Sequence, residues 1–293
     1  MNNSEIFTFI TKENIQVNMN LYMSKNNRRD ITIIYFHGGG LLYGVRDDLP
    51  EIYINKFLNS GYDFLALDYP LAPESKLDVI LKASYEEILY FLENHHSVFE
   101  LETNRYILFG RSAGAYLCFM MCQRLIKNNA VPPMAIISLY GYAKLDEIQF
   151  NTPSKHYNKL AQVPDESIEK IITDSPVTYG PMNLRFSLYI KARQEGTWIK
   201  YICEKEDPAK YSLAEEVLKN FPPTILAAAT LDPDVPYKIS KTLSKVIPNS
   251  QLITIYEDVH DFDRDITKES GRLAYEEIRK WLEERTIRHV PCY

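Results

Sequence analysis

The sequence has no surplus of positive charge. Its 33 lysine and arginine residues are outnumbered by 39 aspartate and glutamate residues, which gives a formal net charge of −6. Nucleic acids and anionic lipid surfaces attract proteins through clustered basic residues. We therefore expect neither a nucleic acid nor a membrane among the partners of this chain.

Long apolar runs are also missing. Apolar stretches such as those at residues 135–139 and 224–231 fall far short of the roughly 20 residues that a membrane-spanning helix needs. The first five residues contain no basic segment that leads into an apolar block, so the sequence predicts no secretory signal. These two absences favour a cytoplasmic protein.

Cysteine is scarce, with four residues at positions 118, 122, 203 and 292. Cys118 and Cys122 are four residues apart in an apolar helical pattern, so they share one helix face and are expected to be buried, reduced thiols. A zinc site needs more ligands than this spacing offers, and the histidines form no H-x-x-x-H pair. The sequence points to no metal and no organic cofactor.

What the sequence does contain is an alternation of short apolar runs with helical patterns. The apolar runs predict strands at residues 31–36, 62–67, 106–109, 135–140, 224–229 and 252–256, and the helical patterns occupy residues 78–94, 113–128, 236–246 and 268–285. Continuous apolar runs are typical of strands that are buried on both faces. We predict an α/β fold with a mostly parallel, doubly wound sheet. Residues 7–9 and 15–22 add a candidate antiparallel hairpin at the start.

One longer segment interrupts this alternation between the fourth and fifth predicted strands. Residues 143–222 hold turn signals at Pro153, Pro164 and Pro176, together with aromatic residues such as Trp198. A plain crossover needs far fewer residues. We predict a single domain over residues 1–293 that contains an inserted, mostly helical cap at 143–222. Such a cap would cover the edge of the sheet where open α/β folds bind ligands.

The strongest chemical motif is Gly-Arg-Ser-Ala-Gly at residues 110–114. It follows the predicted strand 106–109 and opens the predicted helix 113–128, which is the setting that a G-x-S-x-G nucleophile elbow requires. In such a turn the hydroxyl of Ser112 stands clear of the sheet, and flanking glycines avoid a Cβ collision. The start of the helix directs free N–H groups at developing negative charge. Ser112 is therefore the candidate nucleophile.

A second motif, His-Gly-Gly-Gly at residues 37–40, directly follows the strand 31–36. Consecutive glycines let the backbone approach a ligand and direct N–H groups at it, as in the oxyanion loop that accompanies the elbow. A phosphate-binding loop would need G-K-[ST], which is absent. We interpret His37 as a residue that fixes this loop rather than as a catalytic base.

An acid and a histidine follow later, each just after a predicted strand. Asp232 comes after 224–229 and His260 after 252–256, so that the order is Ser, Asp, His. His260 would take the proton of Ser112, and Asp232 would hold the imidazole tautomer. Asp234 is the rival acid. Acidic residues surround His260 and either form a solvated loop or raise the pKa of the imidazole.

These motifs together resemble the hormone-sensitive-lipase-like ("fold-3") family of α/β-hydrolase esterases. The segment Tyr-Pro-Leu-Ala-Pro-Glu at residues 69–74 is similar to that family's Y-R-L-A-P-E signature. The resemblance spans residues 37–262. It implies an α/β-hydrolase fold and a carboxylesterase that acts on short acyl esters of small molecules. It also implies oxyanion donors from Gly39, Gly40 and Ala113, with Gly38 as a further candidate.

Several positions depart from the family pattern. The residue before the serine, usually acidic, is Arg111, and Ala115 stands where a second glycine is usual. Asp234 replaces the leucine of Asp-Pro-Leu, and Asp261 replaces the glycine of His-Gly-Phe. The segment before His37 is short, so the cap is expected to come mainly from residues 143–222. All three triad residues are nevertheless present.

Other interpretations remain open on the sequence alone. The same triad could serve a peptidase or amidase, for which Glu204 and Glu206 are weak candidates to bind an N-terminus. A catalytically silent ligand-binding hydrolase is a second alternative. The tyrosines at positions 43, 140, 142, 157, 179 and 189 either pack or line a substrate pocket. The oligomeric state is open, with a homodimer through residues 252–256 or the last helix as one option.

Overall fold

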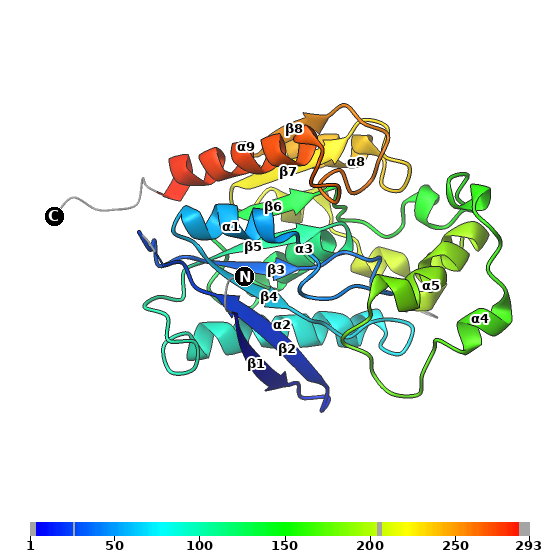
Figure 1. The fold of residues 1–293 in the computed structure, drawn as a ribbon, viewed down its shortest axis with the longest axis horizontal. Coiled ribbons are helices and arrows are strands. Elements are labelled where there is room, and N and C mark those ends of the chain that lie inside the picture. The colour runs from blue at the N-terminus through cyan, green and yellow to red at the C-terminus, as the bar shows by residue number, and fades with distance from the viewer. Residues whose placement is uncertain (1–3, 26, 204–206, 287–293) are drawn as a thin grey trace.

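The computed structural model describes residues 4–25, 27–203 and 207–286. They form an eight-stranded sheet with helices on both faces (Figure 1). The strands are β1 (Glu5–Ile10), β2 (Gln16–Tyr22), β3 (Thr32–Phe36), β4 (Asp63–Leu67), β5 (Tyr106–Arg111), β6 (Ile136–Leu139), β7 (Thr224–Ala229) and β8 (Gln251–Ile255). Their order across the sheet is β1-β2-β4-β3-β5-β6-β7-β8.

The strands from β4 to β8 in this order are parallel to one another. β1 and β2 form an antiparallel hairpin, and β2 pairs antiparallel with β4. Every residue of β3, β4, β5, β6 and β7 is buried, as expected of strands that are covered on both faces. The predicted mostly parallel α/β sheet is confirmed.

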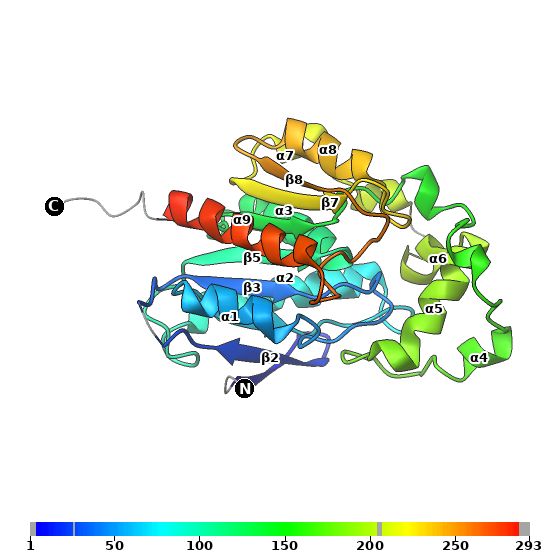
Figure 2. The same ribbon diagram turned by 45° about the horizontal axis from the view of Figure 1, so that its top comes forward.

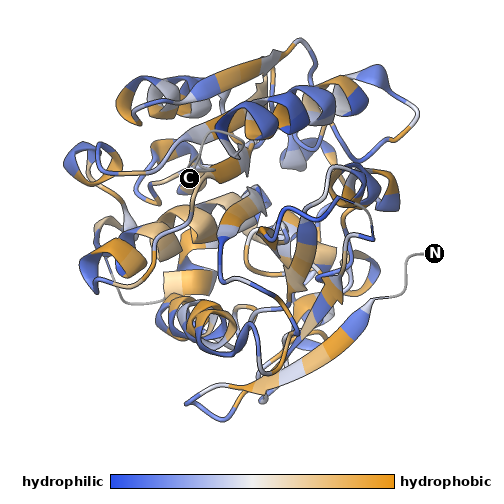
Figure 3. Ribbon diagram, turned by 90° about the vertical axis from the view of Figure 1, so that its left-hand side faces the viewer, coloured by the Kyte–Doolittle hydropathy of each residue, from blue (hydrophilic) through white to orange (hydrophobic). Residues whose placement is uncertain are grey.

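The sheet separates two hydrophobic cores. On one face lie α1 (Glu51–Asn59) and α9 (Glu269–Thr286), which pack aromatic residues against the strands. The other face is covered by α2 (Leu77–Asn94), α3 (Ala113–Lys127) and α8 (Tyr237–Val246). Figure 3 shows that the helices carry both hydrophilic and hydrophobic residues, as amphipathic covering helices do.

The segment between β6 and β7 holds short helices. They are η1 (Ile148–Phe150), η2 (Tyr157–Lys159), α4 (Asp165–Glu169), α5 (Met182–Glu195), α6 (Trp198–Cys203), η3 (Pro208–Tyr211) and α7 (Glu215–Leu218). Figure 2 shows α4, α5 and α6 gathered beyond one end of the sheet. We refer to residues 143–222 as the cap segment.

The expected elements are found with small shifts at their ends, and one helix was missed. The apolar pattern of the sequence does not predict α1, whose buried residues Tyr53, Ile54, Phe57 and Leu58 span little more than one turn. An apolar pattern this short gives little periodicity to detect. The leading residues, expected as a hairpin, form β1 and β2 at the edge of the sheet.

Candidate active site

The nucleophile elbow is formed by the turn between β5 and α3. Ser112 has φ +52° and ψ −117°, a left-handed backbone conformation that costs free energy for a non-glycine residue and is typical of functional sites. A Cβ on Gly110 would lie 2.2 Å from the carbonyl of Gly114, and a Cβ on Gly114 would lie 2.0 Å from the carbonyl oxygen of Phe36. Only glycine fits at both positions, so the turn can bring the chain sharply from β5 into α3 at Ser112.

Three side chains from three different loops form one hydrogen-bonded chain. His260 Nε2 lies 2.9 Å from Ser112 Oγ, and His260 Nδ1 lies 2.7 Å from Asp232 Oδ2. Ser112 follows β5, Asp232 follows β7 and His260 follows β8, so all three stand at the carboxyl end of the sheet. This arrangement can deprotonate the hydroxyl and stabilise the imidazolium that forms.

Asp232 and its rival Asp234 have different surroundings. The Oδ1 atom of Asp232 accepts hydrogen bonds from the backbone N–H groups of Asp234 and Val235, at 2.8 and 2.9 Å, which leaves Oδ2 for His260. Asp234 faces the cap segment instead, where Tyr157 and Tyr189 donate to it and Arg193 forms a buried ion pair. The geometry therefore assigns the histidine contact to Asp232.

Electrostatics favour the protonated form of His260. Burial lowers the pKa of the imidazole, but the charge and hydrogen bond of Asp232 outweigh this effect. The charges of Asp234 and Asp261 also raise the pKa, which increases from 6.5 to about 9. The acidic surroundings thus act in the direction that the sequence suggested. The solvated-loop interpretation is wrong for Asp263, which is fully buried.

The glycine loop after β3 lies against the elbow. Gly39 and Gly40 have φ values of +102° and +59°, which side-chain-bearing residues rarely adopt. Within the described parts of the chain, no backbone carbonyl accepts a hydrogen bond from the N–H groups of Gly39, Gly40 or Ala113. Among the described residues, these three predicted oxyanion donors thus have no backbone acceptor. Ala113 is the first residue of α3.

His37 packs against this loop, and no hydrogen bond among the described residues joins it to Ser112. Its ring is fully buried and stacks on Tyr69 with 4.1 Å between the ring centroids, and burial lowers its pKa. The hydroxyl of Tyr69 donates to the backbone carbonyl of His37 at 2.9 Å. The structural role expected of His37 therefore agrees with its contacts. The hydrogen bond of the Tyr69 hydroxyl gives a structural reason for the tyrosine of the 69–74 motif.

Glu74, the last residue of the 69–74 motif, binds the cap segment. Arg185 on α5 donates to both carboxylate oxygens of Glu74, at 2.9 and 2.7 Å, and also to the carbonyls of Leu42 and Ala72. Trp198 Nε1 on α6 donates to the carbonyl of Gly40 at 2.8 Å. The cap segment is thus bonded directly to the oxyanion loop.

A cavity of about 150 Å³ opens beside Ser112 and His260. Its volume suits a group about the size of benzene. The lining residues are Gly38, Gly39, Gly40, Tyr43, Gly44, Val45, Asp48, Arg111, Ser112, Tyr140, Met182, Tyr189, Asp234, His260, Asp261 and Arg264. Of the six tyrosines singled out in the sequence, Tyr43, Tyr140 and Tyr189 line this cavity, whereas the other three are not part of its wall.

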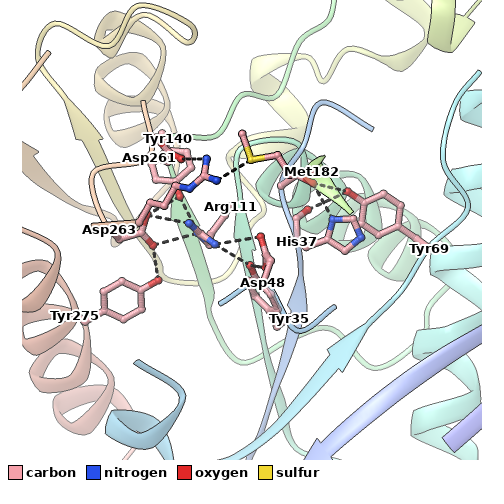
Figure 4. A network of polar contacts seen from close by, with 12 residues as sticks. Tyr35, His37, Asp48, Tyr69, Arg111, Tyr140, Met182, Asp261, Asp263 and Tyr275 are labelled. Atoms are coloured by element: carbon pink, nitrogen blue, oxygen red, sulfur yellow. Dashed lines mark hydrogen bonds and ion pairs between the residues drawn. The ribbon is translucent and has the colours of Figure 1, made fainter. Parts of the chain in front are cut away.

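Sequence reasoning missed a buried polar network around Arg111 (Figure 4). The guanidinium contacts Tyr140, Asp263, Asp48 and Tyr35, which come from four separate segments of the chain. The one available signal was the arginine itself, a cation between an apolar strand and the nucleophile. Its partners could not be found from spacing, because they lie 29 to 152 residues away.

Neither metal ligands nor a membrane-spanning helix were found in the described residues. No group of three or more His, Cys, Asp or Glu residues there is placed to hold a metal ion. None of the helices in the same ranges is both long and apolar enough to cross a bilayer. Cys118 and Cys122 are buried free thiols, and burial raises the pKa of both. Cys203 is also buried, and Cys292 lies outside the described residues.

Comparison with known proteins identifies similar folds over nearly the whole chain. A family model described as alpha/beta hydrolase fold matches residues 33–263. A protein of unknown function from Staphylococcus aureus subsp. aureus Mu50 is 29% identical with a TM-score of 0.86, covering 96% of this chain and 99% of that chain. An alpha/beta hydrolase superfamily protein from Enterococcus faecalis is 29% identical with a TM-score of 0.83, covering 97% and 100%.

Two curated relatives have lower sequence identity. An esterase from Gibberella moniliformis is 24% identical over 202 residues, which is 69% of this chain and 56% of that protein. A non-reducing polyketide synthase from Penicillium roqueforti is 23% identical over 196 residues, which is 61% of this chain and 8% of the synthase. The chain therefore spans less than a tenth of the synthase and little more than half of the esterase.

Proposed function

We propose, from the premise that this chain belongs to the alpha/beta hydrolase family of the hormone-sensitive-lipase type, that it hydrolyses short-chain carboxylic esters. The observation that carries the proposal is the hydrogen-bonded chain from Ser112 through His260 to Asp232. Family membership supports an enzyme of the esterase type. The substrate class and the role of each residue are our inference from the site.

In the proposed reaction, Ser112 Oγ attacks the ester carbonyl carbon while His260 Nε2 takes its proton. The carbonyl oxygen becomes an oxyanion, which accepts hydrogen bonds from the N–H groups of Gly39, Gly40 and Ala113. The imidazolium, stabilised by Asp232, returns the proton to the leaving alcohol. An acyl-enzyme remains on Ser112, and a water molecule activated by His260 releases the acid.

The size of the cavity supports a short acyl group. About 150 Å³ beside Ser112 accommodates an acetyl or butanoyl group, whereas a long fatty acyl chain would exceed it. Aliphatic side chains contribute only Val45 and Met182 to the lining. A wall of this kind offers little apolar surface for a long chain to bury.

The decisive experiment compares wild type with Ser112→Ala on a series of p-nitrophenyl esters from acetate to palmitate. We expect hydrolysis of the short members and a loss on the order of 10⁶-fold in kcat in the variant. A folded wild-type protein that cleaves no ester in the series would contradict the proposal.

Two alternatives belong to the same test. A peptidase or amidase would cleave p-nitroanilides of amino acids in preference to esters, but Glu204 and Glu206, its candidate N-terminus ligands, lie outside the described residues. A silent ligand-binding protein would react with neither substrate nor a fluorophosphonate probe. The 2.9 Å contact between Ser112 and His260 favours an active site over a silent one.

A further inference from the structure

The elbow of this protein contains a buried cation next to the nucleophile. Arg111 is the last residue of β5, immediately precedes Ser112, and is only 6% exposed. Burying a guanidinium costs free energy unless hydrogen bonds and opposite charges satisfy it. The partners that satisfy Arg111 are therefore part of the structure of the elbow.

The guanidinium contacts four polar side chains of the described residues. Nε lies 2.7 Å from the Tyr140 hydroxyl, Nη2 lies 3.2 Å from Asp263 Oδ1, and Nη1 lies 3.2 Å from Asp48 Oδ2. Nη1 also lies 3.4 Å from the hydroxyl of Tyr35. Asp263 has a further partner, because the hydroxyl of Tyr275 on α9 donates to its Oδ2 at 2.8 Å. Figure 4 shows Arg111 at the centre of these side chains.

Two of these contacts lead directly to the general base. Asp263 lies three residues after His260, so it anchors the loop that carries the imidazole. Tyr140 packs its ring against the imidazole with 4.6 Å between the centroids, while its hydroxyl donates to Asp263 Oδ1 at 2.7 Å. The imidazole is thereby fixed on its ring face by Tyr140 and at Nδ1 by Asp232.

The other two contacts lead to the glycine loop. Tyr35 lies on β3 two residues before His37, and Asp48 lies in the loop that follows residues 37–44. Tyr35 donates to Asp48 Oδ1 at 2.6 Å, so the two partners are also bonded to each other. One side chain therefore connects the segments of the nucleophile, the base and the oxyanion donors.

We propose that Arg111 is a positioning residue that, through Asp263 and Tyr140, holds His260 Nε2 in line with Ser112 Oγ. The inference rests on the proposed function, because it assigns no new reaction. It differs from a general packing role in one respect. Loss of the guanidinium should slow the attack of Ser112 more than it weakens substrate binding.

The first test is Arg111→Lys, measured with p-nitrophenyl acetate. An ammonium keeps the charge but cannot reach Tyr140, Asp263 and Asp48 together, because it lacks the planar fork of a guanidinium. We expect kcat to fall about 10- to 100-fold, because small misplacements of catalytic groups cause losses of this size. KM should stay within about twofold of wild type. The rate of Ser112 labelling by a fluorophosphonate should fall in parallel, because it depends on the same base.

Arg28→Lys is the matched control. Arg28 also forms a two-pronged pair with a buried carboxylate, because Nη2 donates to Asp63 Oδ2 at 2.9 Å and Nε donates to Oδ1 at 3.1 Å. This pair lies at the amino end of β4, remote from the site. This variant should lose stability in urea while kcat and the labelling rate stay within about twofold of wild type. Equal losses of kcat in both variants would reduce the role of Arg111 to general stability.

Tyr140→Phe provides a second variant if Arg111→Lys folds poorly. It keeps the ring against His260 and removes only the hydroxyl that contacts Arg111 and Asp263. We expect a loss in kcat of about 3- to 10-fold with KM unchanged.

Rescue by a small molecule distinguishes a positioning role of Arg111 from a role in stabilising the fold. In Arg111→Ala, guanidinium chloride at low millimolar concentration should restore kcat in a saturable way, because Arg111 lines the cavity and its vacated place is reachable. Sodium chloride at the same concentration should not. An increase in KM alone, with labelling unchanged, would contradict the proposal and make Arg111 a substrate contact. Wild type that neither hydrolyses esters nor labels would instead overturn the proposed function.

Discussion

At the scale of single residues, the state of His260 sets when the site can act. A general base must be neutral, and the pKa of this imidazole is raised to about 9 by Asp232 despite the opposing effect of burial. Near pH 7 most of the free protein would then carry a charged imidazole. The elevated pKa also means that the charged imidazole stabilises the fold below pH 6.5, a contribution that is lost as pH rises through about 9.

We therefore predict an alkaline pH–rate profile. The kcat/KM of the free enzyme should rise with pH to a midpoint near 9 rather than near 6.5, measured with p-nitrophenyl acetate after correction for spontaneous hydrolysis. Asp261→Asn should move this midpoint down, because Asp261 favours the charged imidazole. A profile that is flat between pH 6 and 9 would show that the imidazole is already neutral.

Asp232 and Asp234, two residues apart, should respond differently to the same substitution. Asp232→Asn removes the charge behind His260, so we expect a loss in kcat on the order of 10⁴-fold. Asp234→Asn leaves that contact intact but removes the charge beside buried Arg193, so we expect it to destabilise the fold by about 3–5 kcal/mol. Steady-state kinetics and urea unfolding of both variants separate the two effects, and a larger kcat loss in Asp234→Asn would reverse the assignment.

At the scale of elements, a buried ion pair joins α5 to the loop that follows β4. The side chains of Arg185 and Glu74 are 5% and 1% exposed, and the arginine also donates to two backbone carbonyls. Removing one partner of such a pair leaves an uncompensated buried charge, which costs more than the pair itself contributes.

Glu74→Gln should accordingly destabilise the protein by about 3–5 kcal/mol in urea unfolding. The control is Glu216→Gln, which removes a carboxylate from an exposed pair with Lys219 at 3.0 Å and should change stability by less than about 1 kcal/mol. If both variants unfold at the same urea concentration, this contact does not hold the cap segment in place.

At the scale of the whole molecule, the cap segment and the sheet together bound the substrate cavity. Met182 on α5 and the loops at the carboxyl end of the sheet line the same space of about 150 Å³. Under the proposed function, chain-length preference would depend on how the two parts meet rather than on either alone.

Met182→Ala should widen this space and shift preference toward longer acyl chains. We expect the ratio of kcat/KM for hexanoate over acetate to rise by about 10-fold, roughly what one or two buried methylenes are worth. Leu184→Ala, on the same helix but 62% exposed and outside the lining, should leave the ratio unchanged. An unchanged ratio in Met182→Ala would mean that the acyl chain lies elsewhere.

The sequence by itself determined the fold class and the identity of the candidate triad. Buried parallel strands are continuous apolar runs, and strand-to-helix turns with flanking glycines have few solutions, so local patterns revealed both. The parallel order of strands then implied that Ser112, Asp232 and His260 meet at one edge of the sheet. The domain limits and the boundary of the cap at 143–222 stay predictions.

Only the tertiary structure decided which polar groups contact one another. Asp232 and Asp234 are nearly equivalent in sequence. What distinguishes them is that the backbone N–H groups of Asp234 and Val235 donate to one carboxylate oxygen of Asp232, which leaves the other for His260. The partners of Arg111 come from four segments, and no local period relates them. Hydrogen bonds between side chains distant in sequence depend on the packing of the whole chain, and this is why the positioning network became visible only in the fold.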